Sequence, residues 1–513
     1  MGESRIKVRT PVVQAVETMV VDTAGGRMHV RWDETAQATP HGQLVFFAEF
    51  LRATGVFDQW AQSCPLQYRS GNAPAKRDVL GTLMLAILAG HRRYAHITAV
   101  RGDAVAAQAL GMSSMVSEDA VRRALKSIEA EPSETWLRPS LMRSVASALD
   151  RPWVLDIDAS IKPLYGRQEG AELGYNPHKP GRPSHVLHTY WVGDLRLVLD
   201  VQLNPGKQHS SVHAKGGLGR LLDELGPGRR PALVRGDCGF GNEGILTLLE
   251  ERDQRYLLRL RQTKNVQRLV ARQFGRTDWT RADEQGWQAV EDRLQLVGWT
   301  RARRVVVLRR RLREGLALES KRHGVQQLRL ALADEAILDA GRLWEYTVLV
   351  TDVGYALEGV AQLYRDRCDC ENGFDELKNQ WGLSGFTTRD ITRCQTTARA
   401  VALVYNWWSW YCRAAHPGAR MEAITSRPLL LAAVGKTSSH AGQTLLYLTP
   451  LHGKVQTIKT LVANVRAALR HIAATAEQFP SIDRWAALLR YICDRIVGVG
   501  PPRAALVGAQ QTG

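Results

Sequence analysis

The stretch YRDRCDCENGFDELK, from Tyr364 to Lys378, decides how the rest of the chain is interpreted. Apolar residues recur at helical spacing through and around it without an intervening proline, so we expect a single helix. Since a helix turns by about 100° per residue, four polar side chains would share an arc of about 60°: Tyr364, Arg367, Glu371 and Lys378. Such a stripe is either a solvated face with an ion pair between Arg367 and Glu371, or part of a functional site.

Acidic residues also occur upstream, where predicted strands end. The apolar strand in RPWVLDIDAS (151–160) ends in Asp156 and Asp158, and the strand in ALVRGDCGF ends at Asp237. Side chains two residues apart on a strand point to the same face, so Asp156 and Asp158 are both candidates for one site. A buried carboxylate is costly unless it binds a cation or a hydrogen-bond donor, so these acids are candidates for a functional site. The alternatives are a structural acid at Asp156 and a turn aspartate before Gly239 at Asp237.

The spacing in the opening stretch resembles a known signature. Tyr364, Arg367, Glu371 and Lys378 are separated by two, three and six residues. This pattern is similar to the Y-R-E-K signature of bacterial insertion-sequence transposases of the DDE type. The resemblance covers roughly residues 80 to 415. It implies a ribonuclease-H-like catalytic core and the cleavage and joining of DNA.

The resemblance also implies a catalytic triad of Asp158, Asp237 and Glu371. Asp158 is preferred over Asp156 because the matching motif places the acid before a small residue and Ser or Thr, as in IDAS. Phosphodiester cleavage needs a nucleophilic water and stabilisation of charge on the phosphoryl and leaving oxygens, which two Mg²⁺ ions about 3.5–4 Å apart can supply. Hard cations prefer carboxylate oxygens. We therefore expect Mg²⁺, or Mn²⁺ in its place, with Asp158 and Glu371 sharing one ion and Asp237 holding or bridging the other.

Five residues are expected to contact DNA. Arg367 and Lys378 would meet phosphates near the cut, as cations that position the DNA without recognising its sequence. Tyr364 could donate a hydrogen bond to a phosphate oxygen, or it could be a half-buried packing residue. Lys179 and Arg182 lie in GYNPHKPGRPSH, which resembles the loop after the first core strand in one insertion-sequence family, and they are further phosphate candidates.

The predicted architecture is an α/β ribonuclease-H-like core interrupted by an all-β insertion, with helical regions at both ends. Three consecutive strands followed by strand–helix alternation favour the core, and polar–apolar alternation favours the insertion. Related transposases use an insertion-domain tryptophan to hold a flipped base, a role open to Trp287 and Trp299, although core packing is the ordinary alternative. The expected regions are, in order, a mainly helical DNA-binding region, the first part of the core, the β insertion, the second part of the core and a helical C-terminal region: 1–150, 151–263, 264–344, 345–415 and 416–513.

Composition bears on partners and compartment. The 513 residues include 68 Lys and Arg against 51 Asp and Glu, a net charge of +17 that suits a polyanionic partner. Seven cysteines without paired spacing fit a reducing compartment. The N-terminus has no apolar signal segment, and the longest apolar runs are too short to span a bilayer. We expect a cytoplasmic, nucleoid-associated protein without a membrane partner.

These observations predict the transposase of a DNA insertion sequence. It would bind double-stranded DNA at terminal inverted repeats, pair two element ends as a homodimer, and carry out metal-dependent cleavage and strand transfer into target DNA by cut-and-paste. Two alternatives stay open at this stage: a DNA-binding protein of transposase descent with an unused site, and a ribonuclease-H-like, structure-specific nuclease.

Overall fold

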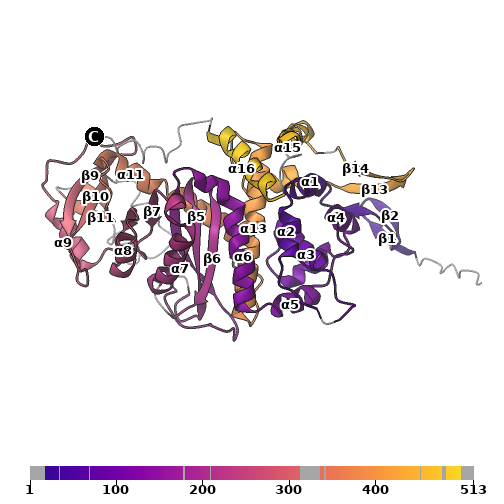
Figure 1. Cartoon of the computed structure of the whole chain (residues 1–513), viewed down its shortest axis with the longest axis horizontal. Helices are drawn as coiled ribbons and strands as arrows, with labels where there is room; N and C mark the ends of the chain where they lie inside the picture. The colour runs from indigo at the N-terminus through magenta and orange to yellow at the C-terminus, as the bar shows by residue number, and fades with distance from the viewer. Residues whose placement is uncertain are drawn as a thin grey trace, which may run out of the picture.

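The computed structural model describes residues 18–33, 35–68, 70–176, 179–207, 210–311, 336–339, 342–450, 452–475 and 481–497. The strands of its large sheet gather on one side of the molecule and its N-terminal helices lie on the other, with long helices between them (Figure 1). No helix in these ranges combines the length and apolar character that a membrane span requires.

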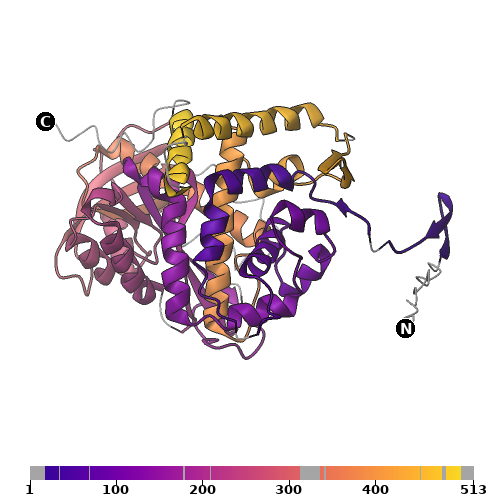
Figure 2. The same ribbon diagram turned by 45° about the vertical axis from the view of Figure 1, so that its right-hand side comes forward.

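The N-terminal part is mainly helical, as predicted from Leu44 onward. Ser117 caps a helix as expected, because its side chain accepts a hydrogen bond from the Ala120 N–H. A hairpin of two exposed strands precedes the helices and extends away from the body (Figure 2). The elements of this part are β1 (Met19–Thr23), β2 (Gly26–Val30), β3 (Ala38–Thr39), α1 (Leu44–Thr54), α2 (Val56–Gln62), α3 (Lys76–Leu88), η1 (Tyr94–Val100), α4 (Ala104–Ala109), α5 (Glu118–Lys126), α6 (Ala130–Val145) and η2 (Ala146–Asp150).

A mixed sheet of nine strands organises the middle of the described chain, with eight strands in the order β6-β5-β4-β7-β8-β12-β10-β9 and β11 paired to β12. β4, β5 and β6 form an antiparallel meander, β7 and β8 run parallel to β4, and the strands beyond β8 are antiparallel again. The elements here are β4 (Val154–Pro163), β5 (Ser184–Val192), η3 (Gly193–Leu195), β6 (Leu197–Pro205), α7 (Ser210–Leu225), η4 (Pro227–Arg229), β7 (Leu233–Gly236), α8 (Glu243–Glu250), β8 (Tyr256–Arg259), α9 (Lys264–Arg272), β9 (Trp287–Leu294), β10 (Arg303–Arg311), β11 (Ala336–Asp339) and β12 (Arg342–Thr351).

The range 264–344 differs from the expected all-β insertion in two respects. It begins with the helix α9, whose apolar residues face the sheet and whose N-terminus is capped by the side chain of Thr263. Its strands also join the sheet that contains β4, because β12 pairs with β8. Residues 312–335, 340 and 341 of this range lie outside the described part of the chain.

The remaining helices follow β12 and return toward the N-terminal part. α13 is buried along nearly its whole length, which confirms that the Trp-rich run within it is a core helix rather than a surface element. The C-terminal region contains a hairpin between its helices, so it is not wholly helical as expected. These elements are α11 (Leu357–Arg365), α12 (Cys368–Gln380), α13 (Ile391–Ala415), α14 (Ala423–Leu430), β13 (Gly435–His440), β14 (Gln443–Leu448), α15 (Val455–Thr475) and α16 (Ser481–Val497).

Candidate active site

Two of the expected acids are brought together by the register between β4 and β7. These strands are parallel, and Ile157 is the partner of Gly236. The next residue on each strand is an aspartate, Asp158 on β4 and Asp237 directly after β7, and neighbouring strands lie about 4.8 Å apart. The Asp237 carboxylate accepts a hydrogen bond from the Gly239 N–H at 2.9 Å, which fixes the turn that follows.

The sequence predicted that Asp158 ends its strand, but the strand continues beyond it. β4 continues to Pro163 because β5 pairs with it along this whole length, from Leu155 opposite Val192 to Pro163 opposite Ser184. What ends near Asp158 is the neighbouring strand β7. The carboxylate is therefore placed at the end of the parallel pair although its own strand runs on.

The third acid reaches the cluster through an arginine. The Arg367 side chain is only 4% exposed, and its guanidinium bridges two carboxylates. One nitrogen lies 2.6 Å from the Glu371 Oε1 atom and another lies 3.3 Å from the Asp158 Oδ1 atom. Glu371 itself is 57% exposed, so its carboxylate faces outward from the cluster toward solvent.

The single helix predicted around these residues is in fact two helices. α11 ends at Arg365 and α12 begins at Cys368, and the Arg367 N–H donates to the Tyr364 carbonyl at 3.1 Å, three residues back. Both linking residues keep right-handed helical angles, so the break is a local tightening of the turn. It contains neither proline nor glycine, and it lies where Arg367 turns toward the acids.

Electrostatic crowding marks the cluster. Burial, together with the carboxylates of Asp237 and Glu371, raises the pKa of Asp158 to about 6, although the Arg367 charge acts in the opposite direction. Like charges that share a site disfavour ionisation, and a nearby cation relieves the conflict. The three acids therefore lie close enough to influence one another and have the oxygen donors that hard divalent cations prefer.

The acids do not form a closed metal cage. Within the described ranges, no group of three or more His, Cys, Asp or Glu side chains is arranged to hold a metal ion. Arg367 accounts for part of this, because its guanidinium takes up an oxygen of Asp158 and an oxygen of Glu371. The donor set suits a divalent cation in its chemistry, and binding one would require Arg367 to release these oxygens.

Asp156, the competing candidate, has a structural partner. Both of its oxygens accept hydrogen bonds from the Arg235 guanidinium at 2.7 Å, and both side chains are buried. Arg235 also donates to the Leu363 carbonyl at 2.5 Å, which ties α11 to the sheet. Sequence reasoning missed Arg235; the available signal was a cation inside the apolar strand LVRG, which needs a buried acid as partner.

Tyr364 and Lys378 lie beside the acids on different helices. Tyr364 is half-buried near the end of α11, and burial raises the pKa of its phenol to about 12. The Lys378 ammonium, on α12, lies 3.3 Å from the Ser160 hydroxyl and 4.7 Å from the centre of the Phe374 ring. Ser160 is two residues beyond Asp158 on β4, so it shares the face of the strand that carries the acid.

Lys179 and Arg182 lie against Tyr165. Lys179 donates a hydrogen bond to the Tyr165 hydroxyl, and the two cations are 4.9 Å and 4.8 Å from the ring centre. No hydrogen bond or ion pair joins either of them to the three acids in the part of the chain that the structure describes. The two insertion tryptophans, Trp287 and Trp299, are 8% and 7% exposed, as expected for packing residues.

The chain belongs to a class of enzymes that act on DNA. The model of the family described as transposase DDE domain group 1 matches residues 24–469, so the chain belongs to this family of transposases. Membership implies DNA binding, DNA cleavage and strand transfer in general, and transposases of this type generally depend on a divalent metal ion.

The chain was also compared with solved structures and with curated proteins. A cryo-EM structure of a piggyBac transposase synaptic complex with hairpin DNA is similar to this chain at 10% sequence identity. The similarity has a TM-score of 0.35 and covers 90% of this chain and 86% of that chain. The comparison with curated proteins finds no match.

Proposed function

We propose that this protein is the transposase of a bacterial insertion sequence, which binds terminal inverted repeats and moves the element by cut-and-paste. The observation that carries the proposal is the gathering of Asp158, Asp237 and Glu371 from two strands and a helix into one cluster. The matching spacing of Tyr364, Arg367, Glu371 and Lys378 supports a Y-R-E-K transposase.

The sheet supports a ribonuclease-H-like core in this proposal. Its inner strands follow the order β6-β5-β4-β7-β8, an antiparallel meander with two parallel strands added beside its first strand. In such a core the acids of the first and fourth strands are neighbours, as the register of Ile157 with Gly236 makes Asp158 and Asp237 neighbours here. The outer strands β9 to β12 then correspond to the β insertion.

In this mechanism Asp158, Asp237 and Glu371 would hold Mg²⁺, or Mn²⁺ in its place. When bound, the metal would supply Lewis-acid stabilisation of the phosphoryl and leaving oxygens and lower the pKa of the attacking water. Arg367 balances the charge of Asp158 and Glu371 while the metal is absent. Lys378 and Tyr364 lie beside the acids, where they could position DNA phosphates.

The chemistry needs no cofactor besides the metal. Water attacks a phosphodiester at the element's end, a phosphorus–oxygen bond forms, and the bond to the 3′ oxygen breaks. The freed 3′-hydroxyl then attacks a phosphodiester of target DNA and releases the 3′ oxygen of the target strand. Each step exchanges one phosphorus–oxygen bond for another. Pairing two element ends calls for two copies of the chain on the DNA.

The test uses the purified full chain, Mg²⁺ and labelled DNA carrying the inverted repeats that flank the gene. We expect cleavage at the repeat ends and joining to a second DNA. Asp237→Asn should reduce cleavage to background and leave binding to the repeats intact. The matched control is Asp375→Asn, which removes one exposed carboxylate from α12 and should cut normally.

Three results would contradict the proposal. Cleavage by Asp237→Asn at the normal rate would show that the acid cluster is not the active site. Binding to the repeats without cutting by the unmodified chain would favour a DNA-binding protein with an unused site. Cutting that depends on DNA structure and ignores the repeats would favour a structure-specific nuclease.

A further inference from the structure

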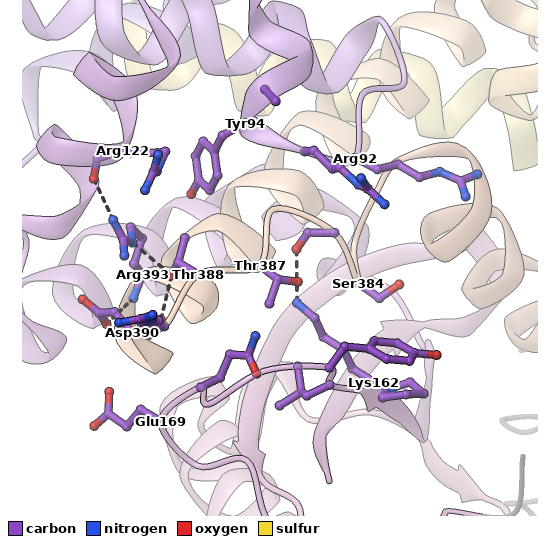
Figure 3. Close-up of a pocket in the computed structure, with 18 of the residues that line it drawn as sticks. Arg92, Tyr94, Arg122, Lys162, Glu169, Ser384, Thr387, Thr388, Asp390 and Arg393 are labelled. Atoms are coloured by element: carbon purple, nitrogen blue, oxygen red, sulfur yellow. Dashed lines mark hydrogen bonds between the residues drawn. The ribbon is translucent and has the colours of Figure 1, made fainter. Parts of the chain in front are cut away.

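A groove with a volume of about 1330 Å³ separates the N-terminal helices from the far end of β4 (Figure 3). One wall carries Arg92 and the α5 residues Arg122 and Lys126, and the other carries Lys162 of β4. Eight of its lining residues are Lys or Arg and three are Asp or Glu. We call this feature the basic groove; its excess of positive charge suits a polyanion.

Two of the three acids of the basic groove accept hydrogen bonds from backbone N–H groups. The Asp390 carboxylate accepts a hydrogen bond from the Arg393 N–H at 3.0 Å and caps α13, and the Glu169 carboxylate accepts one from the Ile391 N–H at 3.2 Å. By contrast, the exposed side chains of Arg92 and Lys126 form no ion pair with any described residue. Their charges are available to a ligand.

A buried lysine forms part of the groove lining. Lys162 is 5% exposed, and its ammonium donates a hydrogen bond to the Gly385 carbonyl at 3.1 Å, as Figure 3 shows. No carboxylate pairs with it among the described residues, and burial lowers its pKa. A buried ammonium without a counter-ion is costly, and an anion in the groove would supply the missing charge.

The basic groove adjoins the acid cluster along one strand. Asp158, Ser160 and Lys162 alternate along β4 and therefore share a face, with Lys162 about 13 Å beyond Asp158. Lys378 connects the two sites, because it lies against Ser160 and also lines the groove. A DNA strand whose phosphate sits at the acids would enter the groove within a few nucleotides.

The shape of the basic groove favours a single strand over a duplex. Backbone and side-chain contacts hold its walls together: the Phe386 N–H donates to the Arg92 carbonyl at 2.7 Å, and the Arg393 guanidinium donates to the Arg122 carbonyl at 3.1 Å. A phosphate has to reach the buried Lys162 ammonium, which is harder for a rigid duplex than for an unpaired strand, whose backbone bends freely.

The rim of the groove adds an aromatic side chain. Tyr165 is 66% exposed, and Lys179 and Arg182 lie over its ring. Surfaces that bind single-stranded nucleic acid combine a positive groove with aromatic side chains in this way. The two cations predicted from sequence as phosphate contacts would thus act at the groove and not at the acids.

We propose that the basic groove holds a short unpaired stretch of the DNA strand next to the cleavage position, with its phosphates on Lys378, Lys162, Lys126 and Arg92. The position relative to the cut rests on the proposed function. The preference for an unpaired strand can be measured by binding alone, without cleavage.

The experiment compares two DNA probes by fluorescence anisotropy, a blunt duplex and the same duplex with a single-stranded tail. The groove variant is Arg92→Ala with Lys126→Ala, which removes two exposed charges. The matched control is Lys264→Ala with Arg268→Ala, which removes two exposed charges from α9, at the other end of the molecule from α5 in Figure 1.

The salt slope is the fall in the logarithm of the binding constant with the logarithm of salt concentration, and each phosphate contact to a single strand contributes about 0.7 to it. Losing two contacts should therefore reduce the slope by about 1.4 and weaken binding to the tailed DNA about 25-fold at about 0.1 M salt. We expect this loss for the groove variant on tailed DNA only, and little change for the control. An equal loss on the blunt duplex would show that the groove takes a duplex, and an equal loss in the control would show a general charge effect; either result overturns the inference. Absence of end cleavage would instead count against the proposed function and leave this comparison intact.

Discussion

The raised pKa of Asp158 predicts an unusual response of stability to pH. Its carboxyl has a pKa of about 6 in the folded chain against an ordinary value of 3.8. Because the folded state favours the protonated form, this residue costs little below about pH 4, and its cost grows between about pH 4 and pH 6 and then levels off. The pKa rises by about two, and each pKa unit corresponds to about 1.36 kcal/mol, so the chain loses about 3 kcal/mol of folding stability at neutral pH.

Asp158→Asn should remove this cost while keeping the shape of the side chain. We expect the variant to unfold at higher urea than the unmodified chain at pH 7, by about 3 kcal/mol in free energy, and at nearly the same urea at pH 4. The measurement is a series of urea titrations between these pH values without divalent metal. Asp375→Asn, which changes an exposed carboxylate on α12, is the control and should show no such trend.

The reasoning is refuted if the difference between Asp158→Asn and the unmodified chain does not depend on pH, or if the variant is the less stable protein at pH 7. The second result would mean that the attraction of Arg367 for the Asp158 carboxylate outweighs burial and the repulsion from Asp237 and Glu371. The acids would then be held as a stable ion-pair network, with little tendency to bind a cation.

Two further predictions concern the same region. Arg235→Met leaves the Asp156 carboxylate buried without its partner and should destabilise the chain by about 3–5 kcal/mol, measured by urea titration. The double variant Arg235→Met with Asp156→Leu should recover part of this loss. Equal stability of the two variants would argue against an isolated buried charge. Mg²⁺ at about 100 times its dissociation constant should stabilise the unmodified chain by about 2.7 kcal/mol at pH 7 and by less at pH 5, where Asp158 is protonated, and should stabilise Asp237→Asn less at either pH. Stabilisation of that variant by the full amount would place the metal elsewhere.

Local patterns in the sequence predicted the local structure well. The apolar runs identified α3 and α13 as buried helices, and Ser117 marked the start of α5. The hairpin between β5 and β6 follows from its turn residues, Gly193 and Asp194. These features depend on neighbours within a few residues, so the sequence carries their signal directly.

Features that depend on distant residues were harder to predict. The partner of Asp156 lies 79 residues away, so only the folded sheet shows that Arg235 occupies it. The length of β4 is set by its pairing with β5, which carries the strand past Asp158. The break between α11 and α12 has no proline or glycine to announce it, since it accompanies the turn of Arg367 toward carboxylates on other elements.

The outer strands belong to the same sheet as the acids, and this limits how the protein can be dissected. β12 pairs with β8 and leads directly into α11. The Arg304 side chain donates a hydrogen bond to the Val353 carbonyl, in the segment between β12 and α11, and Arg365 of α11 pairs with Asp283 at 2.6 Å. Excising residues 264–344 would therefore remove β9, β10 and β11 and leave β12 without its neighbour β10. It would also remove Arg304 and Asp283, whose contacts hold the helix that precedes Arg367. A shortened version of this chain, trimmed for crystallography or for genome engineering, has to keep that segment in place.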